Sequence, residues 1–356
     1  MSRSPAQLGR KDWYGPDPEE PSALQRRLTA AASATRLARR RFVDRARRNP
    51  PGFPATTPYP KVFVVGCGRS GTTWVQECLT GSDAIVSTQE SHAYEYIYEP
   101  LHISGNTHAA WSHILNRYEM GRRLQRWTGL YWWITRDQLL EIASTALSMR
   151  NRPPEAVAQD SIRATFDYWY LAQASKGRVL LEKTPGHVMY GAQILDAFPE
   201  ARIVEVVRDG RDVCVSLEKI AQTMQWPPTR REAQIELWKR AIESGEELHR
   251  HPLAPGRVIR VYYEDMLADP RRELTRLFAA LDVSTTASEI ERISATNNIA
   301  IQNPKANGQR RKGVAGDWRN EFTADDIALF ETLAGDVARR IGYDDVGRVR
   351  EASGPR

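Results

Sequence analysis

Short apolar runs along the chain predict the strands of a buried sheet. Val62–Val65 and Val179–Leu181 are continuous runs of aliphatic and aromatic residues, Ile203–Val207 is an apolar run interrupted by Glu205, and Ala84–Ser87 is a fourth candidate. Continuous runs of this length are typical of parallel strands that are covered on both faces. We therefore expect an α/β protein with three layers around a central parallel sheet.

The first of these runs leads directly into a glycine-rich turn. The segment from Lys61 to Trp74 reads KVFVVGCGRSGTTW, and its glycines allow tight backbone turns. Four backbone amides at the start of the following helix can then converge on one anion. They belong to Ser70, Gly71, Thr72 and Thr73. The segment therefore predicts a P-loop-like site for a phosphate or a similar anionic group.

The spacing of the glycines Gly66 and Gly71 matches that of a Walker A loop, but the residues that follow differ. Thr72 and Thr73 stand where that loop needs lysine and then serine or threonine. The lysine reaches the β and γ phosphates, and the hydroxyl holds magnesium. Here Arg69 supplies positive charge from another place in the turn. A P-loop kinase or NTPase therefore remains an alternative, which the missing lysine weakens.

Two later segments place cations beside the same anion site. In RIVEVVRDGRDVCVS, a strand ends at Arg208, and Ser216 follows eight residues later in a predicted helix. The carboxyl end of a strand is where open α/β sheets bind ligands. In RKGVAGDW, Arg311 and Lys312 precede Gly313 and form a basic loop suited to holding a phosphate.

Together these segments, in this order between Lys61 and Tyr343, resemble the sulfotransferases that use 3′-phosphoadenylyl sulfate (PAPS), in particular their cytosolic-type branch. Many members have Pro-Lys or Pro-Arg where this chain has Gly68 and Arg69. The resemblance implies that GRSGTTW binds the 5′-phosphosulfate and that the two later segments bind the 3′-phosphate. It also implies that Trp74 stacks on adenine and that Tyr263, in VYYEDM, lies on the cofactor side. The implied PAPS-binding residues are Arg69, Ser70, Gly71, Thr72, Thr73, Trp74, Arg208, Ser216, Tyr263, Arg311, Lys312 and Gly313.

The segment LEKTPGH carries the catalytic expectations. The resemblance implies that Lys183, at the end of a strand, stabilises charge on the leaving phosphate during in-line transfer. Cytosolic relatives place a histidine two residues after this lysine, where this chain has Pro185. The general base must therefore come from elsewhere. Glu90 in STQESH is the first candidate, His187 the second and His92 the third.

Composition and cysteine spacing limit the classes of protein to which this chain can belong. The chain has 356 residues, 41% of them hydrophobic, and its three cysteines, Cys67, Cys78 and Cys214, are isolated. Such spacing predicts neither a metal site nor a disulfide framework and favours a reducing compartment. No apolar stretch has the length of a membrane span, and the polar start does not resemble a signal peptide.

We expect a cytoplasmic enzyme that acts on a hydroxylated small molecule, carbohydrate or lipid, without a nucleic-acid partner. A non-catalytic nucleotide-binding protein is the second alternative, and it would be expected to lack Lys183 or the phosphate contacts.

The chain divides into three parts. Residues 1–60 form a basic arm with nine arginines between Arg26 and Arg48, followed by a Pro-rich linker. We expect the arm to be a solvated helix, and peripheral contact with an anionic membrane or an acidic partner is its alternative role. Residues 61–343 are the predicted sulfotransferase domain, in which 91–177 form a mostly helical, aromatic-rich insertion on the acceptor side. Residues 344–356 are predicted to be a flexible tail, and the oligomeric state stays open.

Overall fold

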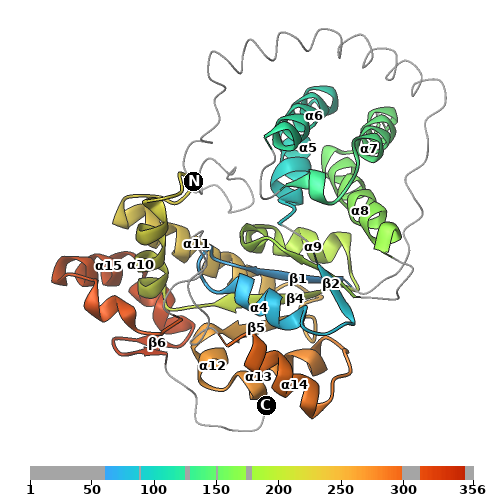
Figure 1. Cartoon of the computed structure of the whole chain (residues 1–356). Helices are drawn as coiled ribbons and strands as arrows, with labels where there is room; N and C mark the ends of the chain where they lie inside the picture. The colour runs from blue at the N-terminus through green and yellow to red at the C-terminus, as the bar shows by residue number, and fades with distance from the viewer. Residues whose placement is uncertain are drawn as a thin grey trace.

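Five short strands form one parallel sheet at the centre of the computed structural model (Figure 1). The structure describes residues 61–87, 90–124, 129–149, 151–173, 179–298 and 313–348. The strands are β1 (Lys61–Gly66), β2 (Ile85–Ser87), β3 (Val179–Lys183), β4 (Arg202–Val207) and β5 (Val258–Tyr262). Their order is β2-β3-β1-β4-β5, and every neighbouring pair is parallel. The predicted fold class, a three-layer α/β fold with a parallel sheet, is confirmed.

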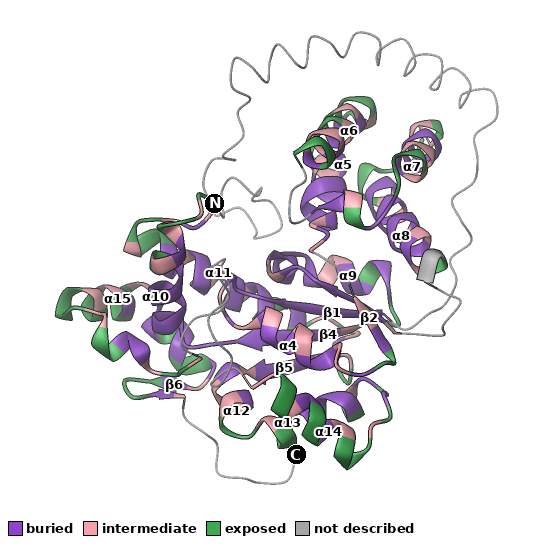
Figure 2. Ribbon diagram, viewed as in Figure 1, coloured by how far each residue is buried: buried purple, intermediate pink, exposed green. Residues whose placement is uncertain are grey.

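Alternate side chains of the central strand face two different hydrophobic cores, as the period of a strand requires. Phe63 and Val65 join one core, and Val62 and Val64 join the other. Helices cover both faces, so that the central strand β1 is buried at every position, whereas β2 and β5 at the edges are only partly buried (Figure 2). The layer over Phe63 contains α9 (Gly191–Ala197), α10 (Gly210–Ala221), α11 (Arg231–His249) and α15 (Ala324–Arg340). The layer over Val62 contains α4 (Thr72–Leu79), α12 (Tyr263–Ala268), α13 (Pro270–Ala280) and α14 (Ala287–Thr296).

A helical insertion separates β2 from β3 and stands at the top of Figure 1. It consists of the π-helical turn η2 (Tyr94–Tyr98), α5 (Glu99–Ile103), α6 (Thr107–Arg123), the turn η3 (Leu130–Trp132), α7 (Arg136–Ser148) and α8 (Pro154–Gln173). Phe166 of α8 packs edge-on against Phe63 of β1, with ring centroids 5.4 Å apart. Trp133 in turn contacts Phe166 at 5.6 Å. The aromatic residues of the insertion therefore extend the core of the sheet, and none of the described helices combines the length and apolarity of a membrane span.

The C-terminal part closes the sheet's edge beside β5. Two further turns are η5 (Pro185–Tyr190), which follows β3, and η6 (Asp317–Asn320), which precedes α15. After α15, β6 (Tyr343–Asp344) pairs with β7 (Gly347–Arg348) in a two-stranded hairpin. The hydroxyl of Tyr343 donates to Glu264 Oε2 at 2.7 Å, and the guanidinium of Arg348 lies 3.5 Å from the ring centroid of Tyr262. The prediction of a flexible tail from residue 344 is therefore wrong for residues 344–348, because these contacts hold the hairpin on α12 and β5. The basic arm 1–60 and residues 349–356 lie outside the described residues.

Gly66 is required where β1 enters its turn. Its φ is 149°, and a Cβ there would lie 2.4 Å from the carbonyl oxygen of Val206. We predict that Gly66→Ala lowers the free energy of unfolding by about 2 to 3 kcal/mol, because the backbone of β4 has to move. Urea unfolding measures this loss.

Gly256→Ala is the matched control for the Gly66 variant. Gly256 also has a positive φ, 70°, but nothing lies within 4 Å of its added Cβ. The free energy of unfolding of this control should fall only by the cost of placing alanine at a positive φ, about 1 kcal/mol. Equal losses in the two variants would show that the contact with Val206 is unimportant.

Candidate active site

The turn after β1 presents backbone donors at the carboxyl edge of the sheet. Arg69 and Gly71 have φ values of 82° and 97°, and no side chain caps the start of α4. The first amides of the helix are therefore directed at the space in front of it. The buried hydroxyl of Ser70 also has no hydrogen-bond partner among the described residues. These groups can bind an anion that enters from outside the chain.

Tyr263 is positioned by the same turn. A Cβ on Gly71 would lie 2.6 Å from the Tyr263 ring, so the glycine allows the ring to pack directly on the backbone. Trp74 contacts Tyr263 edge-on at 5.5 Å, and its indole N–H donates to the carbonyl of Asn297 at 2.7 Å. The two aromatic residues predicted for the cofactor side are therefore neighbours, next to the start of α4.

Arg208 reaches the same place from the end of β4. Its guanidinium lies 4.4 Å from the Tyr263 ring centroid and donates to the carbonyl of Arg69 at 3.4 Å. The side chain is buried, and its Nε has no hydrogen-bond partner among the described residues. Ser216 of α10 accepts a hydrogen bond from Arg69 Nε at 3.1 Å. The structure thus brings Arg69, Arg208 and Ser216 together around the turn.

Asp212 attaches the loop that follows residue 312 to this group. Its carboxylate accepts hydrogen bonds from the backbone N–H of Gly316 at 2.7 Å and of Trp318 at 2.9 Å. Arg208 donates to the carbonyl of Val314 at 3.1 Å, which is the residue after Gly313. The sequence analysis missed Asp212, although the repeated Arg-Asp pairs of RDGRD were a signal for it. Arg311 and Lys312 lie outside the described residues.

Lys183 and Glu90 meet in front of α4. Lys183 lies at the end of β3, and its Nζ is 3.3 Å from Thr73 Oγ1 and paired with Glu90 Oε1. Burial alone would raise the pKa of Glu90, but the positive charges of Lys183 and His92 outweigh it and lower this pKa to about 2. Glu90 is therefore a carboxylate at neutral pH, next to the hydroxyls and amides of the turn.

His187 is enclosed, unlike Glu90. Its side chain has no exposed surface, its Nδ1 lies 2.9 Å from Glu182 Oε2, and its Nε2 lies 3.1 Å from Glu95 Oε2. Burial lowers the pKa of His187, but the two carboxylates outweigh it and raise this pKa to about 9. A protonated histidine with both nitrogens paired is a poor proton acceptor in this state. Sequence reasoning missed Glu95 and Glu182, because nothing in their local sequence shows that they face a histidine.

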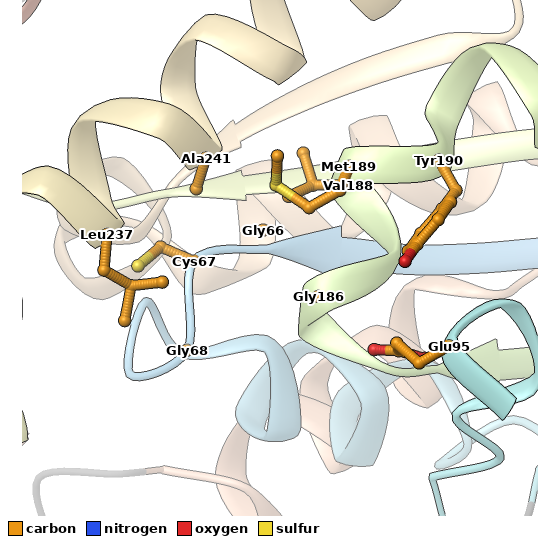
Figure 3. Close-up of a pocket in the computed structure, with 10 residues that line it drawn as sticks. All are labelled: Gly66, Cys67, Gly68, Glu95, Gly186, Val188, Met189, Tyr190, Leu237 and Ala241. Atoms are coloured by element: carbon orange, nitrogen blue, oxygen red, sulfur yellow. The ribbon is translucent and has the colours of Figure 1, made fainter. Parts of the chain in front are cut away.

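An apolar pocket opens beside the turn (Figure 3). It has a volume of about 350 Å³, including the open space at its mouth. Its lining comes from the turn, η2, η5 and α11, and consists of Gly66, Cys67, Gly68, Glu95, Gly186, Val188, Met189, Tyr190, Leu237 and Ala241. The pocket therefore lies between the turn after β1, η2, η5 and α11. Within the described ranges, no group of three or more His, Cys, Asp or Glu side chains is arranged to hold a metal ion.

The sequence is similar to those of known proteins. A family model described as the sulfotransferase family matches residues 60–287. Sulfotransferase 1A1 of Bos taurus is 25% identical over 161 residues, which are 37% of this chain and 53% of that protein. Sulfotransferase 1B1 of Mus musculus is 23% identical over 193 residues, 44% of this chain and 63% of that protein. In both cases the chain spans less than two thirds of the relative's length.

A solved structure is similar over most of the chain. The sulfotransferase STF9 from Mycobacterium avium superposes with a TM-score of 0.50 at 16% sequence identity. The alignment covers 95% of this chain and 91% of that one. This similarity supports the fold.

The charged state of His187 predicts a pH dependence of stability. Its pKa rises from 6.5 in the unfolded chain to about 9 in the folded protein. The ion pairs with Glu95 and Glu182 therefore stabilise the protein fully below about pH 6.5, and this stabilisation is lost as the pH rises through about 9. We expect the Tm measured by calorimetry to fall between about pH 6.5 and about pH 9.5. The fall should be smaller in His187→Gln, and an equal fall in both proteins would contradict a charged His187.

Proposed function

Because this chain belongs to the sulfotransferase family, we propose that it transfers a sulfuryl group from PAPS to a hydroxyl of its acceptor. The observation that carries the proposal is the meeting of Lys183 with Thr73 and Glu90 in front of the anion-binding turn. In-line transfer at sulfur needs an anion cradle, a cation at the leaving phosphate and a base at the attacking hydroxyl. The site offers one group for each of these roles.

The residues around the turn fit PAPS. The amides of residues 70–73 and the Ser70 hydroxyl would hold the 5′-phosphosulfate, since no side chain caps the start of α4 and the Ser70 hydroxyl has no partner among the described residues. Arg208 would hold the 3′-phosphate through its guanidinium, and Ser216 and Gly313 would contribute beside it. Trp74 and Tyr263 would contact the nucleoside. We assign Arg69 to the phosphosulfate and keep Arg311 and Lys312 as the 3′-phosphate partners that the family resemblance implies.

Lys183 and Glu90 would have separate roles in the transfer reaction. PAPS supplies the sulfuryl group and the leaving phosphate. Lys183 would stabilise the charge that develops on that phosphate, together with the amides of the turn. Glu90 would take the proton of the acceptor hydroxyl as its oxygen bonds to sulfur and the bond from sulfur to the phosphate oxygen breaks. We favour Glu90 over His187 because Glu90 is partly exposed beside Lys183, whereas His187 is enclosed and paired on both nitrogens.

The rival functions need groups that are placed differently. A P-loop kinase requires a lysine where Thr72 begins α4, and here the cation comes from β3. A purely nucleotide-binding protein has no need for a buried lysine paired with a carboxylate next to the turn. We further propose that residues 61–348 form the transferase domain and that arginines, lysines and amides supply its positive potential. The acceptor would be a hydroxylated small molecule, carbohydrate or lipid, and the protein would act in the cytoplasm.

Nucleotide binding provides the first test of this function. We predict that 3′-phosphoadenosine 5′-phosphate binds at least about 100-fold more tightly than adenosine 5′-phosphate without magnesium, because the 3′-phosphate adds charge-assisted hydrogen bonds. Isothermal calorimetry measures both affinities. Arg208→Ala should remove most of the preference and leave the affinity for adenosine 5′-phosphate nearly unchanged. Tight binding of ATP that depends on magnesium would instead support a kinase.

The role of Lys183 provides a second test. Lys183→Ala should lower kcat by about 100- to 1,000-fold and leave the affinity for 3′-phosphoadenosine 5′-phosphate within a few-fold, because the lysine acts on developing charge. The assay follows product release from PAPS, with a phenol, a monosaccharide and a long-chain alcohol offered as probe acceptors. Lys219→Ala is the control, since Lys219 pairs with Glu321 away from the site. Normal turnover by Lys183→Ala would exclude the leaving-group role.

A further inference from the structure

Glu90 belongs to a series of paired side chains, beginning at Lys183, in which positive and negative charges alternate. Lys183 is paired with Glu90 Oε1, and the other carboxylate oxygen, Oε2, lies 3.3 Å from His92 Nε2. The second nitrogen of His92, Nδ1, lies 3.5 Å from Glu95 Oε1. Each of the two oxygens of Glu90 therefore has a different cation beside it.

The series of paired charges continues from Glu95 and ends at Glu182, on the same strand as Lys183. Glu95 Oε2 lies 3.1 Å from His187 Nε2, and His187 Nδ1 lies 2.9 Å from Glu182 Oε2. Glu182 is the neighbour of Lys183 in β3. The three cations and three carboxylates thus form a ring that the backbone of β3 closes, and we call it the charge ring: Lys183, Glu90, His92, Glu95, His187 and Glu182.

Burial makes the charge ring a single electrostatic unit. His187, Glu182 and Glu95 are almost completely enclosed, whereas Glu90 keeps 24% of its side-chain surface exposed. Burial lowers the pKa of His92, but Glu90 and Glu95 outweigh it and raise this pKa to about 10. The cations lower the pKa of Glu95 and Glu182 in spite of burial. These imidazoles and carboxylates are charged at neutral pH, because each has at least one opposite charge beside it.

The backbone around His92 is held in an unusual conformation. His92 has a φ of 51°, which residues other than glycine rarely adopt. Its backbone N–H donates to Thr184 Oγ1 at 3.3 Å. The preceding residue, Ser91, donates to Glu182 Oε1 through its backbone N–H at 3.2 Å and through its hydroxyl at 2.8 Å. Contacts with β3 and with the residue after it therefore fix the segment that carries Glu90, and such enforced conformations cluster at functional sites.

We propose that Glu95 and His187 are positioning residues for the transfer reaction, which hold His92 as a cation against Oε2 of Glu90 and leave Oε1 to receive the acceptor proton. This inference rests on the proposed function, because it assigns Glu90 as the base. Lys183 occupies Oε1 in the described structure, and its Nζ already lies 3.3 Å from Thr73 of the turn. A short movement of Lys183 toward the leaving phosphate frees Oε1, while His92 keeps the carboxylate in place. A base held in this way retains the geometry that in-line transfer needs.

Among the described residues, few other charged or titratable groups face His92. On its own segment and on η2 these are Glu90, Glu95 and the ring of Tyr96, whose centroid lies 5.5 Å from that of the imidazole. Lys183, at the end of β3, is paired with Glu90, and Glu90 in turn contacts His92. Arg117 of α6 lies over the ring of Tyr96, with its Cζ 4.2 Å from the ring centroid. Glu95 is therefore the group whose removal changes the protonation of His92 most directly without touching Glu90.

Glu95→Gln tests the proposal, with Glu99→Gln as its matched control. Glu99 is a buried carboxylate of the adjoining helix α5, and it accepts a hydrogen bond from the Tyr190 hydroxyl at 2.9 Å. Nuclear magnetic resonance of ¹⁵N-labelled imidazoles reports the titration of His92, whose signal is assigned by its loss in His92→Asn. We expect Glu95→Gln to lower the pKa of His92 by at least about one unit, and Glu99→Gln to leave it unchanged.

Kinetics then show whether this protonation matters for transfer. With the probe acceptors, Glu95→Gln should lower kcat by at least about 10-fold with an unchanged KM for PAPS, because the base is displaced and the donor site is not. The basic limb of its pH–rate profile should move to lower pH, Glu95→Asp should recover part of the rate, and Glu99→Gln should behave as the wild type. Equal rates and unmoved profiles in both glutamine variants would overturn the proposal.

Two further outcomes separate this inference from the function on which it rests. If the wild type transfers no sulfuryl group to any probe acceptor but prefers the 3′-phosphorylated nucleotide, the proposed reaction fails, whereas the imidazole titration still tests the charge ring. If Glu95→Gln does not fold, His187→Asn removes the next member of the ring and is tested with the same titration. An unshifted His92 in that variant would overturn the positioning role of His187.

Discussion

The rest of the candidate site depends on the pairing of two opposite charges, Glu182 and Lys183, that lie on one strand of the buried sheet. Glu182 and Lys183 are neighbours in β3, so their side chains point to opposite faces of the sheet. An unpaired charge in such surroundings costs several kcal/mol. Ser91 and His187 compensate Glu182, whereas Glu90 and Thr73 compensate Lys183. Because Glu90 and Ser91 are consecutive residues, one short segment serves both faces of the strand.

A second set of contacts joins the other strands to the same edge. Arg208 at the end of β4 contacts Tyr263 at the start of α12, the turn after β1, and the loop before η6. Asp212, one helical turn later, fixes that loop through two backbone N–H groups. Since parallel strands place all their carboxyl ends at one edge, residues from β1, β3 and β4 converge there although they are far apart in the sequence. The turn after β1, which we propose binds the anion, and the charge ring are therefore neighbours as a consequence of the topology.

Local pattern was sufficient to predict much of this architecture. The apolar runs identified β1, β3 and β4, because a strand buried on both faces must be apolar at successive positions. The glycines identified the turn, because only a residue without a side chain allows Tyr263 to pack on Gly71. The same reasoning failed for residues 344–348. Their hairpin is held by Tyr343 and Arg348 on distant elements, and no signal within the tail itself indicates those partners.

The sequence by itself therefore determined the fold class, the anion-binding turn and the identities of Lys183, Arg208 and Glu90 as candidates, since each depends on residue type and near neighbours. Only the tertiary structure decided which titratable groups face each other. Glu90 and His187 were the first and second candidates for the general base, and folding enclosed His187 between Glu95 and Glu182 and left Glu90 beside Lys183. The physical reason is that protonation and access depend on burial and on charges only a few ångströms away. The folded chain brings those charges from segments that are almost a hundred residues apart.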